Sequence, residues 1–486
     1  MVKSKKENTT KHSIKQGDLG TSGNPEIINA STDYELCDTR MTAYGGLLAL
    51  EKVMDLVNFK ELFERYYCSP GRKPELGCYR MVYGLILLLF IGFSRIGHFY
   101  YIRHDSMVCG ILQVRVLPAI STFWRYLSSL LLNQSESLLN LGAAIRRRVW
   151  QLCSLGYDSI CIDVDTTVST VYGAIEGSRK GHNTKHRGKK GLRPVFLFIE
   201  ETREYLCGTQ RSGTTMTDKE MARLIRDIRK YLPECVKHVL VKGDGEFIGR
   251  ETVHACEECG FKYIFANKRC AAVFDESTWE TWNEYDYNET MYEPKDWGKR
   301  YRFVVMRIRE DQKGDRQLDL FDGENKYMHR VFVTNEAGRS YRVIRMYDKR
   351  ASVEGMIKEA QQEGILAIPS KRFLSNHCFF QIVMLTYNIW RWMKLLAGHQ
   401  QIMAKPQQEV IPENEMGDVI KEANIVNHTI RIARLKMLFI AAKIVTHERK
   451  TTVKYSEHDE RSAGIMDFME YLDRRRSEPR PWACAA

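Results

Sequence analysis

The segment Ser159-Ile160-Cys161-Ile162-Asp163-Val164-Asp165-Thr166-Thr167-Val168 decides the fold of this chain of 486 residues. Before it, apolar residues recur every three or four positions, as in helices, and at Tyr157 the pattern changes to that of a β-strand. Acidic residues are depleted in strands because burying them costs free energy. An apolar strand that ends in two carboxylates therefore predicts both a sheet and a site for a cation.

The residues after this segment predict the other elements of a mixed α/β core. Two strands joined by a tight turn come first, and a helix with Thr217 as its N-cap follows them. A short strand closed by Gly243-Asp244-Gly245, a second helix and a last strand complete the order β-β-β-α-β-α-β, which is typical of a mixed α/β fold. The predicted elements are Pro194–Glu201, Glu204–Arg211, Thr217–Tyr231, His238–Lys242, Glu251–Cys259 and Tyr263–Ala266.

Composition and periodicity divide the rest of the chain. The first 35 residues are polar, so we expect them to be disordered, and helical spacing dominates from there to residue 150. Two strand-like runs, Tyr301–Arg309 and Tyr327–Thr334, indicate an inserted β-hairpin region. The predicted divisions are a basic and polar tail at 1–35, a helical N-terminal domain at 36–150, a first part of the core at 151–270, a β-rich insertion at 271–335, a second part of the core at 336–400 and a helical C-terminal region at 401–486.

A further acidic position lies on a predicted helix that spans residues 347–358. On one continuous helix, the side chains of Tyr347, Arg350, Glu354 and Lys358 would share about one quarter of the circumference. Such a face could bind a metal ion beside a phosphate group. A solvated helix face with salt bridges is the alternative interpretation, and the helix alone does not distinguish the two.

Carboxylates at the ends of apolar strands are what a hard cation requires. Asp163 or Asp165 ends one strand, Asp244 ends another, and Glu354 lies on the later helix. Two Mg²⁺ ions about 4 Å apart need several carboxylate oxygens and can activate a water molecule or a 3′-hydroxyl group. Each aspartate alone has a structural alternative as a turn residue or a cap.

A basic segment, Ser178–Arg193, follows the first carboxylate strand and is punctuated by glycines. Together with the net charge of +12, it indicates an acidic partner, of which nucleic acid is the leading candidate. A solvated surface loop on a merely basic enzyme is the alternative. The segment lacks the Walker A spacing, so we expect no nucleotide cofactor. Its candidate DNA-binding residues are Lys180, Lys185, Arg187, Lys189, Lys190 and Arg193.

The cysteines and the apolar runs bear on the compartment. The 13 cysteines have no regular spacing and the N-terminus lacks the apolar region of a secretory signal, so we expect reduced thiols and a cytoplasmic protein. The longest apolar run, Met81–Phe93, is too short to span a bilayer, and no membrane segment is predicted.

Together these motifs resemble the DDE transposases of bacterial insertion sequences, and most of all the IS1380 branch of the IS4-like transposases. The resemblance covers most of the chain from about residue 40 and rests on the order and spacing of the motifs. They are Asp163–Val168 with Tyr172-Gly173, Arg211-Ser212-Gly213-Thr214, Gly243-Asp244-Gly245-Glu246-Phe247, Val333-Thr334-Asn335, Tyr347 with Arg350 and Glu354, and Asn376 with Tyr387-Asn388.

The resemblance implies an RNase H-like catalytic core that is interrupted by a β-strand insertion and flanked by helical N- and C-terminal regions. It implies that Asp165, Asp244 and Glu354 are catalytic and bind two Mg²⁺ ions, for which Mn²⁺ can substitute. Asp163 is the alternative to Asp165 at the first position.

The resemblance also implies contacts with DNA. Tyr347 and Arg350 match phosphate-contacting positions, and the helical N-terminal domain is expected to bind DNA. The lysine usually found seven residues after the glutamate is Gln361 in this chain. Lys358, one helical turn earlier, is a candidate substitute.

The implied function is a transposase that cuts at the terminal inverted repeats of its own element and joins the 3′-hydroxyl ends to target DNA. A homodimer that bridges two ends is expected, in the bacterial cytoplasm and associated with the nucleoid. Two alternatives stay open: a metal-dependent nuclease of the same fold without strand transfer, and a catalytically inactive DNA-binding protein. Inverted repeats flanking the coding region would favour the transposase.

Overall fold

The computed structural model describes residues 28–181, 186–267, 272–309, 327–405 and 411–482. By internal contacts the chain divides into two units, residues 1–39 and residues 40–486. Most of the predicted disordered tail, residues 1–27, lies outside the described residues. Residues 28–39 are almost entirely exposed and contain a single turn.

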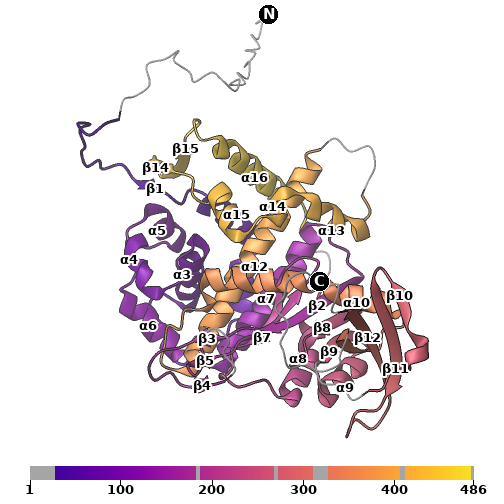
Figure 1. Cartoon of the computed structure of the whole chain (residues 1–486). Coiled ribbons are helices and arrows are strands. Elements are labelled where there is room, and N and C mark those ends of the chain that lie inside the picture. The colour runs from indigo at the N-terminus through magenta and orange to yellow at the C-terminus, as the bar shows by residue number, and fades with distance from the viewer. Residues whose placement is uncertain (1–27, 182–185, 268–271, 310–326, 406–410, 483–486) are drawn as a thin grey trace, which may run out of the picture. The chain divides into compact units, whose positions relative to one another are not determined.

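A mixed sheet forms the centre of residues 40–486 (Figure 1), with the strand order β10-β11-β12-β13-β9-β8-β2-β6-β7. Strand β6 pairs antiparallel with β2 and β7 antiparallel with β6, whereas β8 runs parallel to β2 and β9 parallel to β8. The predicted succession of strands and the mixed α/β class are confirmed. The strands predicted from the α/β pattern are β2 (Ser159–Thr166), β6 (Val195–Ile199), β7 (Tyr205–Thr209), β8 (His238–Gly243) and β9 (Lys262–Asn267).

The predicted insertion is larger than a hairpin and belongs to the same sheet. The bounds predicted for Tyr301–Arg309 and Tyr327–Thr334 are confirmed as β12 and β13, and β10 (Glu280–Trp282) and β11 (Tyr285–Tyr292) precede them. All four strands are antiparallel, and β13 pairs antiparallel with β9. This pairing buries Phe332 and Val333 of β13 beside the apolar strand β9, so the insertion widens the central sheet.

Helices fill the chain before the sheet and connect its strands. The helix predicted after Thr217 is confirmed: Thr217 and Glu220 form a reciprocal capping box at the start of α8. The helices before the sheet are α1 (Leu47–Leu56), α2 (Phe59–Tyr66), α3 (Cys78–Ile91), η1 (Ile96–His98), α4 (Phe99–Ile102), α5 (Ser106–Leu112), α6 (Ile120–Ser129) and α7 (Leu132–Leu152). Those after β7 are α8 (Asp218–Tyr231), α9 (Arg250–Glu258), η2 (Glu276–Thr278), α10 (Ser340–Asp348), α11 (Ala351–Ala360), the π-helical turn η4 (Gln361–Ile365) and α12 (Phe373–Met403).

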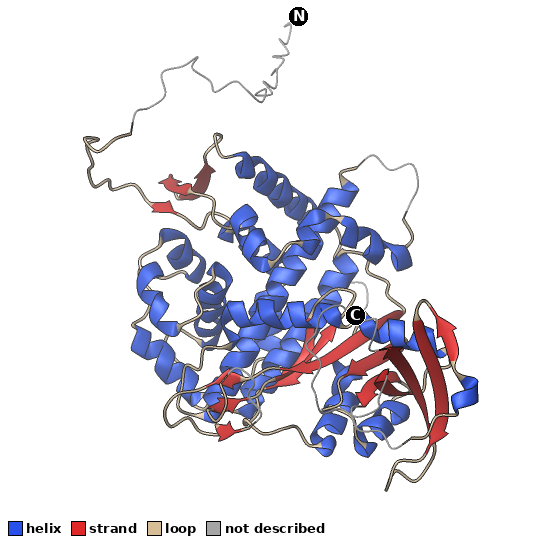
Figure 2. Cartoon of the chain, in the orientation of Figure 1, coloured by secondary structure: helices blue, strands red, loops and turns tan. Residues whose placement is uncertain are grey.

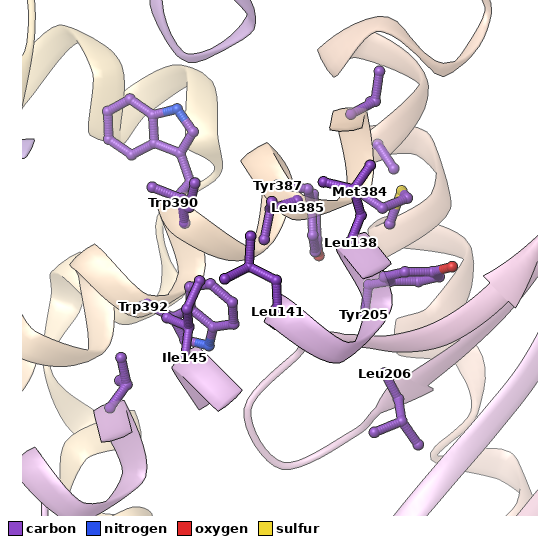
Figure 3. Packing of buried hydrophobic residues seen from close by; sticks show 14 of the residues in the cluster. Leu138, Leu141, Ile145, Tyr205, Leu206, Met384, Leu385, Tyr387, Trp390 and Trp392 are labelled. Carbon is purple, nitrogen blue, oxygen red and sulfur yellow. The ribbon is translucent and has the colours of Figure 1, made fainter. Parts of the chain in front are cut away.

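The hydrophobic core joins the N-terminal helices to the sheet. Helix α12 is long and mostly buried, and it packs against α7 and β7. Figure 3 shows side chains of these three elements interlocking, among them Leu138, Leu141, Ile145, Tyr205, Leu206, Met384, Leu385, Tyr387, Trp390 and Trp392. The first helices and the sheet therefore share one core.

The C-terminal region contains a β-hairpin as well as helices, so the prediction of a helical region at 401–486 is incomplete. Strands β14 and β15 pair with each other, and β14 also pairs with β1 at the start of the compact unit (Figure 2). The elements are β1 (Met41–Thr42), α13 (Glu413–Glu422), α14 (Asn424–Asn427), α15 (Ile430–Met437), β14 (Ala442–His447), β15 (Lys450–Tyr455) and α16 (Glu460–Ser477).

Among the described residues, no single helix has both the length and the apolar character needed to cross a membrane. One pair of segments, Cys78–Ile91 with Ile96–Ile102, reaches that length and character only jointly, and it is bent by 88°. Every residue of α3 from Met81 to Ile91 is buried inside the protein.

Candidate active site

Two of the predicted carboxylates lie at the ends of neighbouring parallel strands. Val164 of β2 pairs with Gly243 of β8. The residues that follow this pair, Asp165 and Asp244, therefore lie side by side at the C-terminal ends of the two strands. Both side chains are half-buried. Gly243 permits the close approach behind them, because an added Cβ would lie 2.8 Å from the Phe265 ring.

The charges of three other predicted site residues, Arg350, Asp244 and Glu354, act on Asp165. Its Oδ1 accepts a hydrogen bond from the Thr166 amide at 2.7 Å, and its Oδ2 lies 3.5 Å from Nη2 of Arg350. Burial raises the pKa of the Asp165 carboxyl, and the negative charges of Asp244 and Glu354 raise it further, against the opposing effect of Arg350. Asp244 and Glu354 are thus both near enough to repel the Asp165 carboxylate.

The segment 347–358 is not one helix, and the prediction of a single continuous face is wrong. Helix α10 ends at Asp348, and α11 begins at Ala351, with Arg350 as its N-cap residue. Glu354 lies in the first turn of α11 and is exposed. The chain turns at Lys349–Arg350 because Arg350 reaches back to the sheet, where its Nη2 donates to the Val164 carbonyl at 2.7 Å.

Tyr347 belongs to the core more than to an open surface. Its side chain is buried against Phe332, with ring centroids 4.7 Å apart, and the Arg350 guanidinium lies 5.9 Å from its ring centroid. Burial raises the pKa of the Tyr347 phenol, and the Asp244 charge adds to this effect against that of Arg350. Its phenol group therefore stays protonated beside the carboxylates.

Asp163, the alternative to Asp165, is enclosed in the sheet. It is fully buried, and its Oδ1 lies 3.3 Å from Nζ of Lys242, the residue that faces it on β8. Lys242 also donates to Glu200 at 2.5 Å. Burial raises the pKa of Asp163 to about 6, although the Lys242 charge opposes this. These contacts are those of an internal ion pair.

Glu246 is a fourth acidic residue at the site, and the sequence reasoning assigned it no role. Burial raises the pKa of the Glu246 carboxyl, Arg193 lowers it, and the charges of Asp244 and Asp165 raise it. Arg193 forms a partly buried ion pair with Glu246. The spacing of Glu246 two residues after Asp244 was the available signal, since the Asp244 side chain accepts from the Glu246 amide at 3.0 Å.

Gln361, which stands where the family resemblance leads us to expect a lysine, connects two elements of the site. Its Nε2 donates to Oγ1 of Thr167 at 2.7 Å. Thr167 follows Asp165 by two residues, and Gln361 follows the helix that carries Glu354. Lys358 lies exposed on that helix.

The basic segment contributes two strands to a small separate sheet with the order β3-β5-β4, and the residues just after β2 contribute the third. The strands of this sheet are β3 (Ser169–Thr170), β4 (Arg179–Lys180) and β5 (Lys190–Leu192). Lys180, Arg187, Lys189 and Lys190 are exposed, whereas Arg193 is buried and paired with Glu246. Lys185 lies outside the described residues.

Comparison with known proteins identifies the family. The family described as Transposase DDE domain group 1 matches residues 34–412, which is most of the chain. The chain belongs to this transposase family. Membership implies a metal-dependent enzyme that cleaves DNA. No curated protein matches the chain.

One solved structure that resembles this transposase is a cryo-electron-microscopy structure of the piggyBac transposase synaptic complex with hairpin DNA. The two chains share 8% sequence identity with a TM-score of 0.39, over 80% of this chain and 82% of that chain.

The described residues of this transposase contain no group of three or more histidine, cysteine, aspartate or glutamate side chains arranged to hold a metal ion. The three predicted carboxylates nevertheless offer the hard oxygen donors that Mg²⁺ and Mn²⁺ prefer. Their mutual repulsion at Asp165 is the kind of field that a bound cation relieves. Asp165, Asp244 and Glu354 are therefore the residues that would supply these oxygen donors to a divalent ion.

Proposed function

We propose that this protein is a DNA transposase of the IS1380 branch of the IS4-like transposases, which cuts at the terminal inverted repeats of its own element and joins the 3′-hydroxyl ends to target DNA. The observation that carries the proposal is the placement of Asp165 and Asp244 at adjacent strand ends, both coupled electrostatically to each other and, at Asp165, to Glu354. Membership of the family supports the reaction class.

An RNase H-like catalytic core is part of this proposal. It is supported by the strands β7-β6-β2-β8-β9, in which three antiparallel strands are continued by two parallel ones. In chain order, Asp165 lies near the end of the first of these strands, β2, and Asp244 directly follows the fourth, β8. The second part of the core, which follows the insertion, supplies Glu354.

We assign the metal-binding role to Asp165, Asp244 and Glu354, which would hold two Mg²⁺ or Mn²⁺ ions. Such ions neutralise charge on the phosphodiester and lower the pKa of a nucleophilic oxygen. Asp163 is the less suitable candidate, because its contacts with Lys242 enclose it.

The chain's own residues position the reactants. Arg350, held by the Val164 carbonyl, is placed to steady Asp165 and to contact a phosphate at the strand ends. Both reaction steps, hydrolysis and strand transfer, are in-line displacements, so holding the attacking and leaving oxygens in line contributes much of the rate. Glu246 and Arg193 form an ion pair beside Asp244, at the border of the proposed site.

DNA is the proposed partner, bound at the terminal repeats and at the target. The exposed residues Lys180, Arg187, Lys189 and Lys190 of the small sheet are suited to phosphate contacts. Lys358 would contact phosphate nearer the reacting group, and the helical N-terminal region would extend the interface. A homodimer that bridges two transposon ends, acting on the bacterial nucleoid, completes the proposal.

The test is cleavage of labelled duplex DNA that carries the element's own terminal repeat, with Mg²⁺ or Mn²⁺. We expect nicking at the repeat boundary by the wild type, and its loss in Asp244→Asn and in Glu354→Gln. Glu234→Gln is the matched control, because Glu234 is exposed before the opposite end of β8.

Three outcomes would change the assignment. Cleavage that survives Glu354→Gln would show that the third carboxylate is elsewhere. Hydrolysis without any joining of the cut ends to a second duplex would favour the metal-dependent nuclease. Binding without cleavage under either metal would favour the inactive DNA-binding protein.

A further inference from the structure

The hairpin β14–β15 has a face that the proposed active site does not use. It spans residues 442–455, beyond residue 412 where the family match ends. The register pairs Lys443 with Lys454 and His447 with Lys450, so these four side chains project from one face of the two-stranded ribbon. All four are exposed.

The opposite face fixes the ribbon to the protein. Ile444 and Val453 form a cross-strand pair and pack against the hydrophobic core. The Tyr455 hydroxyl donates to the Gly45 carbonyl at 2.9 Å, and β1 pairs with β14 on its other edge. The ribbon is therefore attached to the protein through its apolar face and through its pairing with β1 (Figures 1 and 2).

The arrangement of charge on the outer face is unfavourable for the isolated protein. Lys443 and Lys454 lie directly opposite each other, and like charges at such positions repel. Across the described parts of the chain, none of Lys443, Lys450 and Lys454 has an ion-pair partner. A polyanion bound to this face would remove the repulsion.

The turn of the hairpin is strained as well. Glu448 and Arg449 both adopt positive φ angles, 46° and 65°, in a two-residue turn where glycine or asparagine is favoured. Strained backbone persists where the surrounding structure or a function maintains it. Here it places the Arg449 guanidinium at the tip, next to Lys450, with the Glu448 carboxylate as the one acidic group of the ribbon.

We propose that this ribbon is a second DNA-binding surface, one that contacts the phosphate backbones of duplex DNA away from the reacting phosphate. The inference rests on the proposed function, because that function makes duplex DNA the partner. Lys450 and Lys454 are four residues apart on one strand face, which separates them by about 14 Å. That distance is close to the roughly 12 Å width of the major groove, which admits a two-stranded ribbon. Cations at both ends of the ribbon can thus reach the two backbones that border one groove.

The experiment compares the binding of the full-length wild type and the Lys443→Ala/Lys454→Ala variant to duplex DNA, without divalent metal, at several salt concentrations. We expect affinity for terminal-repeat DNA and for unrelated DNA to fall by a similar factor, about tenfold. The slope of log affinity against log salt should become shallower by about 1.8, since each lost phosphate contact accounts for roughly 0.9. Lys443→Arg/Lys454→Arg should keep the wild-type slope.

The matched control is Lys219→Ala/Lys295→Ala, which removes the same charge from two exposed lysines, one on α8 and one between β11 and β12. An equal loss in this control would reduce the effect to net charge and overturn the inference. An unchanged slope in Lys443→Ala/Lys454→Ala, with circular dichroism like that of the wild type, would also overturn it. Because binding is measured without metal, a failure of the catalytic proposal shows separately, as binding without cleavage.

Discussion

Two aspartates two residues apart on β2 have opposite environments, although their side chains project to the same face. Asp163 is enclosed with Lys242, and Asp165 lies at the strand end with Arg350, Asp244 and Glu354 around it. A carboxylate that is enclosed by its own protein does not reach a phosphodiester. The distinction between the two could be made only from the pairing of β2 with β8.

We predict that Asp165→Asn abolishes metal-dependent cleavage, whereas Asp163→Asn keeps it within about fivefold of the wild-type rate. Losing a carboxylate that stabilises the transition state by ~4 kcal/mol lowers the rate by about a thousandfold. The measurement is the single-turnover cleavage rate at saturating Mg²⁺, with far-ultraviolet circular dichroism as the control for folding. The reverse result, activity lost only in Asp163→Asn, would move the first catalytic position to Asp163.

We propose that Gln361 and Lys358 each take one part of the role that the family resemblance assigns to one lysine. We predict that Gln361→Ala slows cleavage about tenfold at unchanged DNA affinity, because the bond to Thr167 aligns the Glu354 helix with the Asp165 strand. Lys358→Ala should instead weaken DNA binding and leave the rate at saturating DNA within about twofold of the wild type. The reason is that the exposed Lys358 ammonium would contact a phosphate equally in the bound complex and in the transition state. Titration of DNA in single-turnover assays separates the two effects. A change in affinity for Gln361→Ala would contradict the positioning role.

At the scale of elements, the helix that carries Glu354 is anchored at its far end by buried charges. Glu359 pairs with Arg391 of α12, and Glu363 in the adjoining turn pairs with Arg434 of α15. Burial raises the pKa of the Glu363 carboxyl, and Arg434 opposes this. Removing one partner of such a pair leaves an uncompensated buried charge.

We predict that Arg434→Met lowers the free energy of unfolding by about 3 kcal/mol at pH 8. Without Arg434 the pKa of Glu363 rises further above its unfolded value, so Glu363 takes up a proton more readily in the folded chain. Its contribution to stability is therefore present at low pH and is lost as the pH rises through the folded pKa. The deficit relative to the wild type should narrow as the pH falls, as measured by urea unfolding at several pH values.

A double variant separates the pair from the packing around it. Arg434→Met/Glu363→Met should be more stable at pH 8 than Arg434→Met, because no charge is then left buried without a partner. A deficit that is equal at all pH values would show that Arg434 stabilises through its other contacts, which are the packing against Trp390 and the hydrogen bond to the Phe90 carbonyl.

At the scale of the whole molecule, the helical N-terminal region and the sheet are tied together by one buried carboxylate. Glu204, in the turn between β6 and β7, is fully buried and accepts hydrogen bonds from Arg146 and Trp150 of α7 at 3.0 and 2.8 Å. Trp392 of α12 donates to the same carboxylate at 2.6 Å. Elements far apart in sequence thus share one buried polar centre.

We predict that a fragment of residues 40–158 does not unfold cooperatively, because the donors Arg146 and Trp150 lose Glu204 and the apolar face of α7 loses α12. Circular dichroism during thermal unfolding of the fragment and of the full chain checks this. A sharp transition in the fragment would show that the helical region folds alone, as a domain bounded near residue 150.

The features that depend on neighbouring residues could be predicted from the sequence. These are the apolar strands with carboxylates at their ends, the Thr217 cap, and the order of strands and helices that gives the mixed α/β class. Periodicity and capping act within a few residues, so they can be predicted without knowing the fold.

The contacts between residues far apart in the chain could be identified only from the tertiary structure. The break at Lys349–Arg350 arises because Arg350 is held by β2, and Arg193 leaves the basic surface because Glu246 lies beside it. The insertion joins the sheet because β13 pairs with the edge of β9. The hairpin after α15 is held in place because β14 pairs with β1. Each of these outcomes depends on partners more than 30 residues away, which no local pattern of the sequence specifies.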